Sequence, residues 1–225
     1  MGQSTMTSGQ SDPSKLVIMT IGKTAVGKTT TLERVCASMG ALHISEAGIK
    51  EALKSHYCAK DCLDEGLRDL AYRGAIAIAF HTASSGVAAA IDASFHRLHR
   101  RQWLYEAVSQ TAIRLAVLHC YCENPRKITQ RIAERQRAPL TAKTHAGSMD
   151  IVRHIASGFE TPKVQELPSS VPTAFFQVNT DSNHLEDVKV ESAGDGEFQS
   201  LADLLKSTLE QHLESCRGGI VPRMV

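Results

Sequence analysis

The sequence predicts an α/β fold, in which a doubly wound and mostly parallel sheet of five strands carries helices on both faces. Strand-like and helix-like segments alternate along the chain, which is typical of a parallel sheet. The first strand-like run, residues 16–21, is apolar apart from one threonine, as expected of a central strand that is covered on both sides. The expected strands are residues 16–21, 43–45, 87–91, 113–121 and 174–178.

The expected helices carry apolar side chains at helical spacing. Residues 28–39 show this most clearly, and Gly40 is placed to end their helix because glycine readily adopts the left-handed conformation found there. The apolar face of this helix carries Leu32, Val35, Cys36 and Met39. The other expected helices are residues 65–80, 97–109, 126–137 and 198–213.

The chain is expected to form a single domain over residues 15–215. A polar N-terminal tail of residues 1–14 precedes it, and a C-terminal tail of residues 216–225 follows it. A helical lid is expected at residues 126–165. Four prolines and several polar turns in residues 138–172 predict a mobile excursion within and beyond this lid.

Composition and charge exclude several classes of protein. The 225 residues are 42% hydrophobic and 22% charged, near the average of soluble globular proteins, which argues against a disordered, collagen-like or coiled-coil chain. Lysine and arginine number 25 against 24 aspartates and glutamates, so the chain lacks the basic field of a nucleic-acid coat protein. Residues 16–21 are too short to cross a membrane, and residues 1–14 lack the basic start of a secretory signal. Because the six cysteines are scattered without a CxxC pair, we expect a cytoplasmic protein with reduced thiols.

A glycine-rich segment between the first strand and the first helix carries the strongest signal. It matches the pattern G-x-x-x-x-G-K-[ST] in full, in the strand-loop-helix context that the pattern requires. Its residues are Gly22, Lys23, Thr24, Ala25, Val26, Gly27, Lys28 and Thr29, followed by Thr30. Backbone N–H groups of such a loop surround phosphates, and the helix that follows adds its positive dipole end. We expect a P-loop NTPase fold that binds ATP and Mg²⁺, with Lys28 at the β- and γ-phosphates and the Thr29 hydroxyl on the metal.

Asp92 directly follows a buried strand. A single carboxylate at this position is suited to holding Mg²⁺ or contacting a substrate hydroxyl, whereas the alternative is an aspartate that caps the next helix. The sequence contains neither N-K-x-D nor D-x-x-G, which excludes a GTPase switch protein.

The order of further motifs resembles that of the small P-loop kinases, which include polynucleotide kinase, gluconate kinase, zeta toxin and chloramphenicol phosphotransferase. The resemblance covers approximately residues 16–182. It rests on the P-loop, Asp92-Ala93-Ser94-Phe95, Arg101, Asn124-Pro125 and the segment from Arg131 to Arg135. It implies an ATP-dependent phosphotransferase in which Arg101 contacts substrate or phosphate.

Arg131 and Arg135 are four residues apart, so a helix presents them on one face. Guanidinium groups in a lid can stabilise the negative charge that spreads over the transferred phosphoryl group. The alternative is a solvated charged helix in which Glu134 pairs with its neighbours.

The segment after the second strand departs from these relatives, which usually have an aspartate as general base and an arginine that holds the acceptor. This chain has Glu46 and Lys50 near those positions. Either Glu46 or Asp92 is expected to be the base, and the alternative for Glu46 is an acid that only stabilises a helix N-terminus. Lysine lacks the bidentate fork of arginine, so the acceptor is expected to differ from those of the better-known relatives.

The sequence therefore predicts transfer of the γ-phosphate of ATP to a hydroxyl of a small molecule. Two alternatives remain. The first is a 5′-hydroxyl polynucleotide or RNA kinase, with a basic groove from Arg97, Arg100, Arg101 and Arg153. The second is a nucleotide-binding regulatory module with slow ATPase activity. Cys120 and Cys122 share one face of a strand while His119 lies on the other, which favours buried thiols over a metal site.

Overall fold

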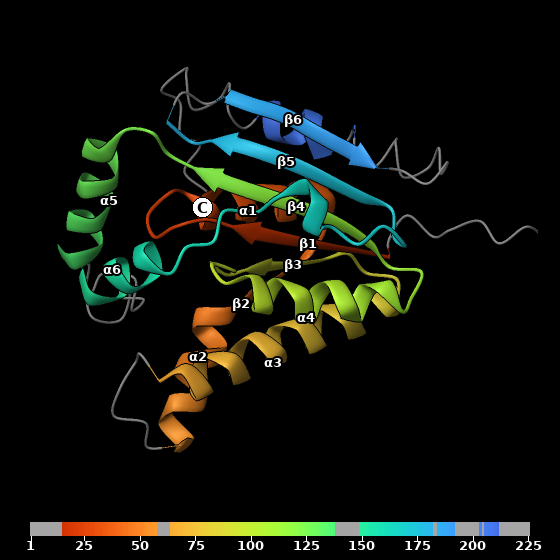
Figure 1. Ribbon diagram of the computed structural model, residues 1–225, viewed down its shortest axis with the longest axis horizontal. Helices are drawn as coiled ribbons and strands as arrows, with labels where there is room; N and C mark the ends of the chain where they lie inside the picture. Colours follow the sequence, from red (N-terminus) through yellow and green to blue (C-terminus); the bar gives the residue numbers. More distant parts are fainter. Residues whose placement is uncertain are drawn as a thin grey trace, which may run out of the picture.

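A six-stranded sheet in the order β2-β3-β1-β4-β5-β6 forms the centre of the molecule (Figure 1). The computed structural model describes residues 15–57, 64–137, 149–181, 184–191, 203 and 205–211. The strands are β1 (Leu16–Ile21), β2 (Leu42–Ser45), β3 (Ala89–Asp92), β4 (Arg114–Tyr121), β5 (Thr173–Asn179) and β6 (His184–Glu191). Strands β1 to β5 are parallel, which confirms the predicted five-stranded parallel sheet.

Strand β6 was not among the expected strands. It pairs antiparallel with β5 at the edge of the sheet. Its eight residues include five polar or charged ones and only three apolar ones, which gives a weak alternating signal. The register also shifts between Phe175 and Phe176 of β5. An edge strand needs few apolar residues, which is why composition alone suggested a polar connection here.

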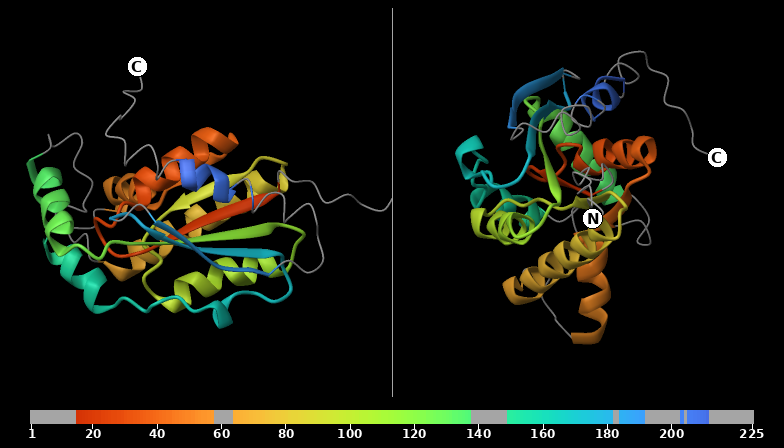
Figure 2. Two further views of the ribbon diagram at one scale, coloured as in Figure 1. Left: turned by 90° about the horizontal axis from the view of Figure 1, so that it is seen from above. Right: turned by 90° about the vertical axis from the view of Figure 1, so that its right-hand side faces the viewer.

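Helices cover both faces of the sheet, as predicted (Figure 2). Successive side chains of a strand point to opposite faces, so β1 supplies both halves of the core. Leu16 and Ile18 pack with α1 (Lys28–Met39) and with the helical residues 205–211. The opposite face of β1 packs on α3 (Glu65–Ser84) and α4 (Leu98–Ser109) through Val17, Met19 and Ile21.

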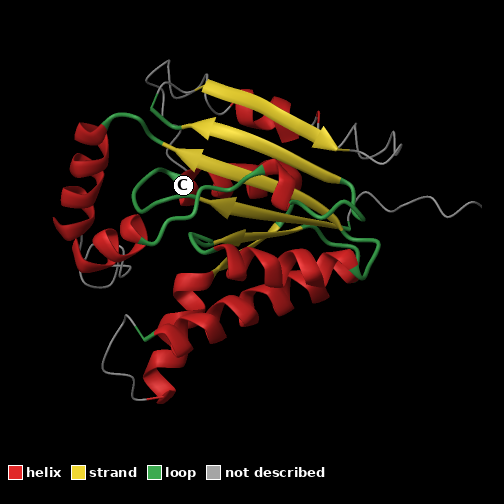
Figure 3. Cartoon of the chain, in the orientation of Figure 1, coloured by secondary structure: helices red, strands yellow, loops and turns green. Residues whose placement is uncertain are grey.

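The carboxyl ends of the parallel strands meet at one edge of the sheet. Helices α5 (Pro125–Arg137) and α6 (Met149–Ser157) stand beyond this edge, where the arrows of β1, β4 and β5 point (Figures 1 and 3). Helix α2 (Glu46–Tyr57) follows β2 directly, and the register pairs Ser45 with Asp92. Ligands of open α/β sheets bind at this edge, so the fold itself indicates where the site lies.

Helix α5 coincides with the helix expected at residues 126–137, while the assignment of residues 126–165 as a lid stays a prediction. Within the expected excursion of residues 138–172, the structure has α6 and a short 3-10 helix, η3 (Val164–Glu166). Residues 138–148 lie outside the described part, as do the two expected tails, 1–14 and 216–225. None of the helices in the described part is both long and apolar enough to cross a bilayer.

Candidate active site

The P-loop connects β1 to α1, and both of its glycines are required by local geometry. A Cβ atom at Gly22 would lie 2.4 Å from the backbone oxygen of Cys120 on β4, closer than two such atoms can approach. Gly27 has φ of 94° and is the residue that precedes α1. Ala25 also takes a positive φ, of 63°. The loop thus curls at the N-terminus of a 12-residue helix, an arrangement that favours phosphate.

The Lys28 side chain folds back across the P-loop. Its Nζ donates a hydrogen bond to the backbone oxygen of Lys23 at 2.7 Å. Burial lowers the pKa of Lys28, whereas the nearby Asp92 carboxylate raises it and Arg135 lowers it further. Lys28, Asp92 and Arg135 therefore interact electrostatically, although they belong to α1, β3 and α5, which are far apart in the sequence.

Thr29 and Asp92, the two residues expected to hold Mg²⁺, are in direct contact. The Thr29 hydroxyl donates to Oδ2 of Asp92 at 2.7 Å. Burial alone would raise the pKa of Asp92, but interactions with His43 and Thr29 and the charge of Lys28 outweigh it and lower that pKa. A hydroxyl and an ionised carboxylate are the oxygen ligands that Mg²⁺ prefers, so these residues fit the metal.

His43 on β2 is a neighbour of Asp92 that the sequence did not indicate. Its Nε2 lies 3.7 Å from Oδ2 of Asp92. The interaction with Asp92 raises the pKa of His43. The contact follows from the pairing of β2 with β3, because His43 lies two residues before the end of β2 and Asp92 ends the neighbouring β3.

Glu46 is the first residue of α2 and is buried, with 8% of its surface exposed. Ser45 caps the helix by accepting a hydrogen bond from the backbone N–H of Gly48. Among the described residues, Oε1 of Glu46 has no hydrogen-bond partner. Burial raises the pKa of Glu46, although the positive charges of Lys50, Arg68 and Arg100 oppose the shift. Glu46 and Asp92 thus lie at neighbouring strand ends in contrasting surroundings.

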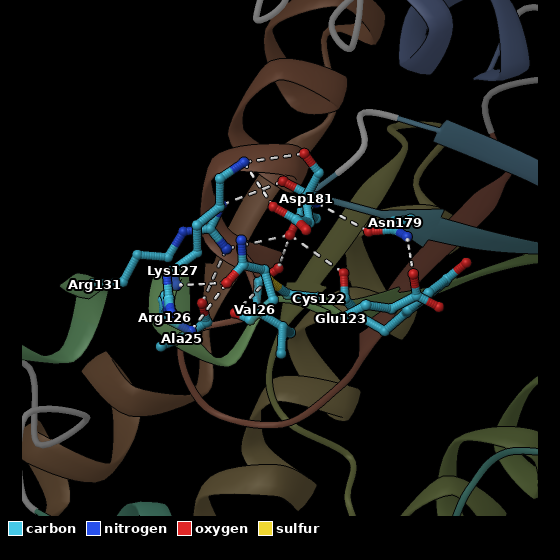
Figure 4. A network of polar contacts seen from close by, with 12 residues as sticks. Ala25, Val26, Cys122, Glu123, Arg126, Lys127, Arg131, Asn179 and Asp181 are labelled. Atoms are coloured by element: carbon cyan, nitrogen blue, oxygen red, sulfur yellow. Dashed lines mark hydrogen bonds and ion pairs between the residues drawn. The ribbon is translucent and has the colours of Figure 1, made fainter. Parts of the chain in front are cut away.

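Arg131 of α5 binds the P-loop from the lid side (Figure 4). Its NH1 donates to the Ala25 oxygen at 3.1 Å and to Oγ1 of Thr180 at 3.2 Å, and its NH2 donates to the Thr180 oxygen at 3.3 Å. The Thr180 hydroxyl in turn donates to the Val26 oxygen at 2.6 Å. Lys127, one turn earlier, forms an ion pair with Asp181 at 2.7 Å. These contacts join the lid helix, the P-loop and the loop after β5.

Arg135 lies one turn beyond Arg131 and is partly buried. Burial lowers its pKa, whereas Asp92 raises it. These two arginines do not lie on a helix face exposed only to solvent. Arg131 is hydrogen-bonded to the P-loop, and Arg135 interacts electrostatically with Asp92 at the end of β3.

Arg101 of α4 makes its hydrogen bonds to groups of the protein itself. It is fully buried, and its NH1 donates to the backbone oxygens of Phe95 and Glu160 at 3.0 and 2.9 Å. Its NH2 donates to Glu166 at 2.9 Å. Through NH1 and NH2, Arg101 ties α4 to the segment after α6, whereas its Nε has no hydrogen-bond partner among the described residues. These contacts point to a structural role for Arg101, while the substrate or phosphate contact implied by the resemblance stays a prediction.

Three buried side chains near Glu46 were missed by sequence reasoning or assigned little weight: Arg68 of α3, His96 after β3 and Arg100 of α4. Arg68 stands on the face of α3 that also buries Leu67 and Ala71. An arginine on an apolar helix face was the available signal. No motif marks these residues, because they come from two helices and a loop that meet only in the folded chain.

The described cysteines are free thiols. Burial raises the pKa of Cys120 to about 12 and that of Cys36 to about 11, so neither is a thiolate at neutral pH. In the described ranges, no group of three or more histidine, cysteine, aspartate or glutamate side chains is arranged to hold a metal.

Comparisons with known proteins agree with this architecture. A family model described as an AAA domain, AAA_33, matches residues 17–159. No curated protein sequence matches significantly.

Solved structures with the same fold cover most of the chain. Kti12 of Chaetomium thermophilum, in complex with ADP-AlF3, has a TM-score of 0.57 at 14% identity, covering 86% of this chain and 98% of that one. A sugar kinase of Janibacter has a TM-score of 0.53 at 16% identity, with 90% and 94% covered. The APS kinase of Mycobacterium tuberculosis, in complex with AMPPNP and APS, has a TM-score of 0.53 at 17% identity, with 84% and 96% covered. At these identities the likeness establishes the fold, and the family model covers more than half of the chain. The chain therefore belongs to the AAA_33 family of AAA domains and has the P-loop fold of the small kinases.

Proposed function

We propose that this protein is an ATP-dependent phosphotransferase that moves the γ-phosphate of ATP to a hydroxyl of a small-molecule acceptor. One observation carries the proposal: two carboxylates at adjacent strand ends differ in environment. Asp92 accepts a hydrogen bond from the Thr29 hydroxyl, whereas Glu46 is buried and its Oε1 has no hydrogen-bond partner among the described residues. Similar structures that include a sugar kinase and an APS kinase support the same class of reaction.

The nucleotide phosphates are assigned to the P-loop. Lys28 is the cation for the β- and γ-phosphates, because its ammonium already lies across the loop. Arg131 and Arg135 approach the same loop from α5 and are assigned to the phosphoryl group. Thr29 and Asp92 would hold Mg²⁺, which supplies charge neutralisation at the phosphate oxygens.

Glu46 is assigned as the general base. The acceptor hydroxyl oxygen attacks the γ-phosphorus, the bond from that phosphorus to the β–γ bridging oxygen breaks, and ADP leaves. The proton of the hydroxyl goes to Oε1 of Glu46, the oxygen without a partner. A raised pKa makes Glu46 a stronger proton acceptor than an ordinary glutamate, whereas the lowered pKa of Asp92 suits a metal ligand.

The test is ADP release with and without a panel of hydroxyl compounds. Glu46→Gln should lower acceptor-dependent ADP release by about 100-fold or more, while ATP binding stays within threefold of the unmodified protein. Lys28→Ala should lose both activity and tight ATP binding. Glu33→Gln, which changes an exposed carboxylate on α1, is the matched control and should change neither.

ADP release that no compound in a broad panel accelerates would contradict the kinase proposal and favour the regulatory alternative. Full activity in Glu46→Gln would remove Glu46 from the role of base and return Asp92 as the candidate.

A further inference from the structure

A group of buried hydrogen-bond donors lies near Glu46, at residues that the proposed reaction does not use. The donors come from Arg68 of α3, from Arg100 of α4 and from His96 in the loop between β3 and α4. Their exposed fractions are 4%, 0% and 0%. Both arginines act electrostatically on Glu46, which places the group beside the proposed base.

The two arginines are only partly satisfied by protein groups. Arg100 donates through Nε and NH2 to Asp69 at 2.9 and 2.7 Å, and its NH2 also bonds Glu65. In the part of the chain that the structure describes, NH1 of Arg100 has no partner, and neither Nε nor NH1 of Arg68 makes a hydrogen bond. NH1 of Arg68 lies 3.6 Å from the half-exposed Glu65 carboxylate, an ion-pair distance only.

A relay of hydrogen bonds determines which nitrogen of His96 carries the proton. The Phe95 N–H donates to the Tyr72 hydroxyl at 3.2 Å, so Tyr72 can donate its own proton to Ser94 Oγ, 2.8 Å away. Ser94 then donates to Nδ1 of His96 at 2.9 Å. The reverse direction would leave the buried Tyr72 proton without an acceptor.

This direction leaves the proton of the neutral His96 ring on Nε2, as a donor. Burial and the surrounding positive charges hold the pKa of His96 at about 2, so the ring is neutral at physiological pH. Nε2 is buried and has no partner among the described residues. His96 therefore adds an uncharged N–H to the N–H groups of Arg68 and Arg100.

Unpaired donors of this number are costly. A buried donor without a partner costs about 1–3 kcal/mol, and more when it is charged. Native proteins retain few such groups. Arg68, Arg100 and His96 thus offer several unpartnered donors. Among the described buried side chains, the only carboxylate oxygen without a partner that could accept from them is Oε1 of Glu46. The surplus is of buried N–H donors, which the several oxygens of an oxyanion would satisfy.

We propose that Arg68, Arg100 and His96 bind an oxyanion of the acceptor, so that the substrate is a hydroxyl compound that also carries a phosphate, sulfate or carboxylate group. This inference rests on the proposed function for the role of the ligand as an acceptor. It separates two anion sites: the P-loop, Lys28 and α5 take the nucleotide phosphates, while α3 and α4 take the acceptor. Arginine suits this task because its planar fork can hold two oxygens at once.

The binding test uses inorganic phosphate as the probe, with the P-loop already filled by saturating ADP and Mg²⁺. Isothermal titration should show one phosphate site in the unmodified protein. Arg68→Met should weaken phosphate binding at least tenfold, and Arg68→Lys, which keeps the charge but loses the fork, should weaken it by less. Arg73→Met, at an exposed position of the same helix, is the control and should bind as the unmodified protein does. Arg68→Lys also covers the case in which Arg68→Met does not fold.

The activity test compares ribose, ribose 5-phosphate and gluconate as neutral, phosphate-bearing and carboxylate-bearing acceptors. We expect kcat/KM for at least one anionic acceptor to exceed that for the neutral one by 100-fold or more, and Arg68→Lys to reduce this preference at least tenfold. Phosphorylation of the neutral sugar as efficiently as of both anionic compounds would overturn the anion site and leave the kinase proposal intact.

If no acceptor is phosphorylated, the binding test decides. Phosphate binding that depends on Arg68 in the presence of ADP and Mg²⁺ would support the anion site, even though the proposed function had failed. Phosphate binding that is absent, or unchanged in both Arg68 variants, would overturn the inference.

Discussion

At the scale of single residues, the two carboxylates of the site are distinguished by what surrounds them. Asp92 receives a hydrogen bond from Thr29 and lies near His43 and Lys28, which keep it ionised. For Glu46, the effect of burial, which raises the pKa, exceeds the opposing effect of its basic neighbours, so its pKa is raised. The sequence left the identity of the base open between these two residues, because local pattern cannot reveal how strongly each is desolvated.

The pH dependence of the reaction should reveal Glu46. A general base must be deprotonated to act, so kcat/KM for the acceptor is expected to rise with pH through the pKa of Glu46. Because that pKa is raised, the midpoint should lie above the value of about 4.3 that is usual for glutamate. A pH–rate profile at saturating ATP measures it. The acidic limb should disappear in the residual activity of Glu46→Gln, and a limb that persists there would assign it to another group.

Metal dependence should distinguish Asp92 from Glu46. Asp92→Asn removes the negative charge beside Thr29, and we expect it to weaken ATP binding in the presence of Mg²⁺ by about tenfold or more. Binding measured with excess chelator should change little. Glu46→Gln is the control and should keep the Mg²⁺ effect, whereas an equal loss in both variants would contradict the division of roles.

At the scale of elements, two segments hold the site together. The lid helix α5 contacts the P-loop through Arg131, and the segment after α6 is held to α4 by Arg101. The order of sequence motifs led us to expect Arg131 at the transferred phosphoryl group and Arg101 at the substrate or phosphate. The structure instead separates a lid arginine at the P-loop from a buried arginine that binds two backbone oxygens and Glu166.

The lid is expected to act on the chemical step. Arg135→Ala should lower kcat by about 100-fold, because a guanidinium near Lys28 and Asp92 is lost from the charged transition state. ATP affinity should change by less than tenfold. Steady-state kinetics would measure both constants, with Arg126→Ala, an exposed position on the same helix, as the control. An Arg135→Ala enzyme that matches this control would show that α5 contributes no charge to catalysis.

Arg101 should affect stability. Arg101→Ala leaves Glu166 and two backbone oxygens without their buried partner, and we expect a loss of about 3 kcal/mol in the free energy of unfolding. For a chain of this size that corresponds to a fall of roughly 6–12 °C in Tm. Thermal unfolding followed by circular dichroism measures it, with the exposed neighbour Gln102→Ala as the control. An unchanged Tm combined with a higher KM would contradict this structural role and support Arg101 as a substrate contact.

At the scale of the whole molecule, the sequence predicted the parallel sheet and the phosphate loop because both have local signatures. A continuous apolar strand followed by G-x-x-x-x-G-K-T needs no tertiary information. Strand β6 was missed because an edge strand carries a weak pattern. The donor group at Arg68, His96 and Arg100 was missed for a different reason: each residue alone resembles an ordinary surface or packed side chain, and only the packing of α3 against α4 brings the arginines together.

The near balance of 25 basic and 24 acidic residues also has a clearer meaning in the folded chain. Positive charge is concentrated at one edge of the sheet, at Lys28, Arg131 and Arg135 on the nucleotide side and at Arg68 and Arg100 on the acceptor side. A neutral protein can thus gather several cations at one site, and on the acceptor side, where carboxylates pair with the arginines, this arrangement favours a small anionic acceptor over a long polyanion.

Transfer of label from ATP tests the central claim most directly. The protein would be incubated with Mg²⁺, ATP labelled at the γ-phosphate and a panel of anionic hydroxyl compounds, with Glu46→Gln in parallel. We predict that the unmodified protein moves the label to an organic acceptor and that Glu46→Gln, though it still binds ATP, does not. Label that appears only as inorganic phosphate, at equal rates in both proteins, would contradict the account.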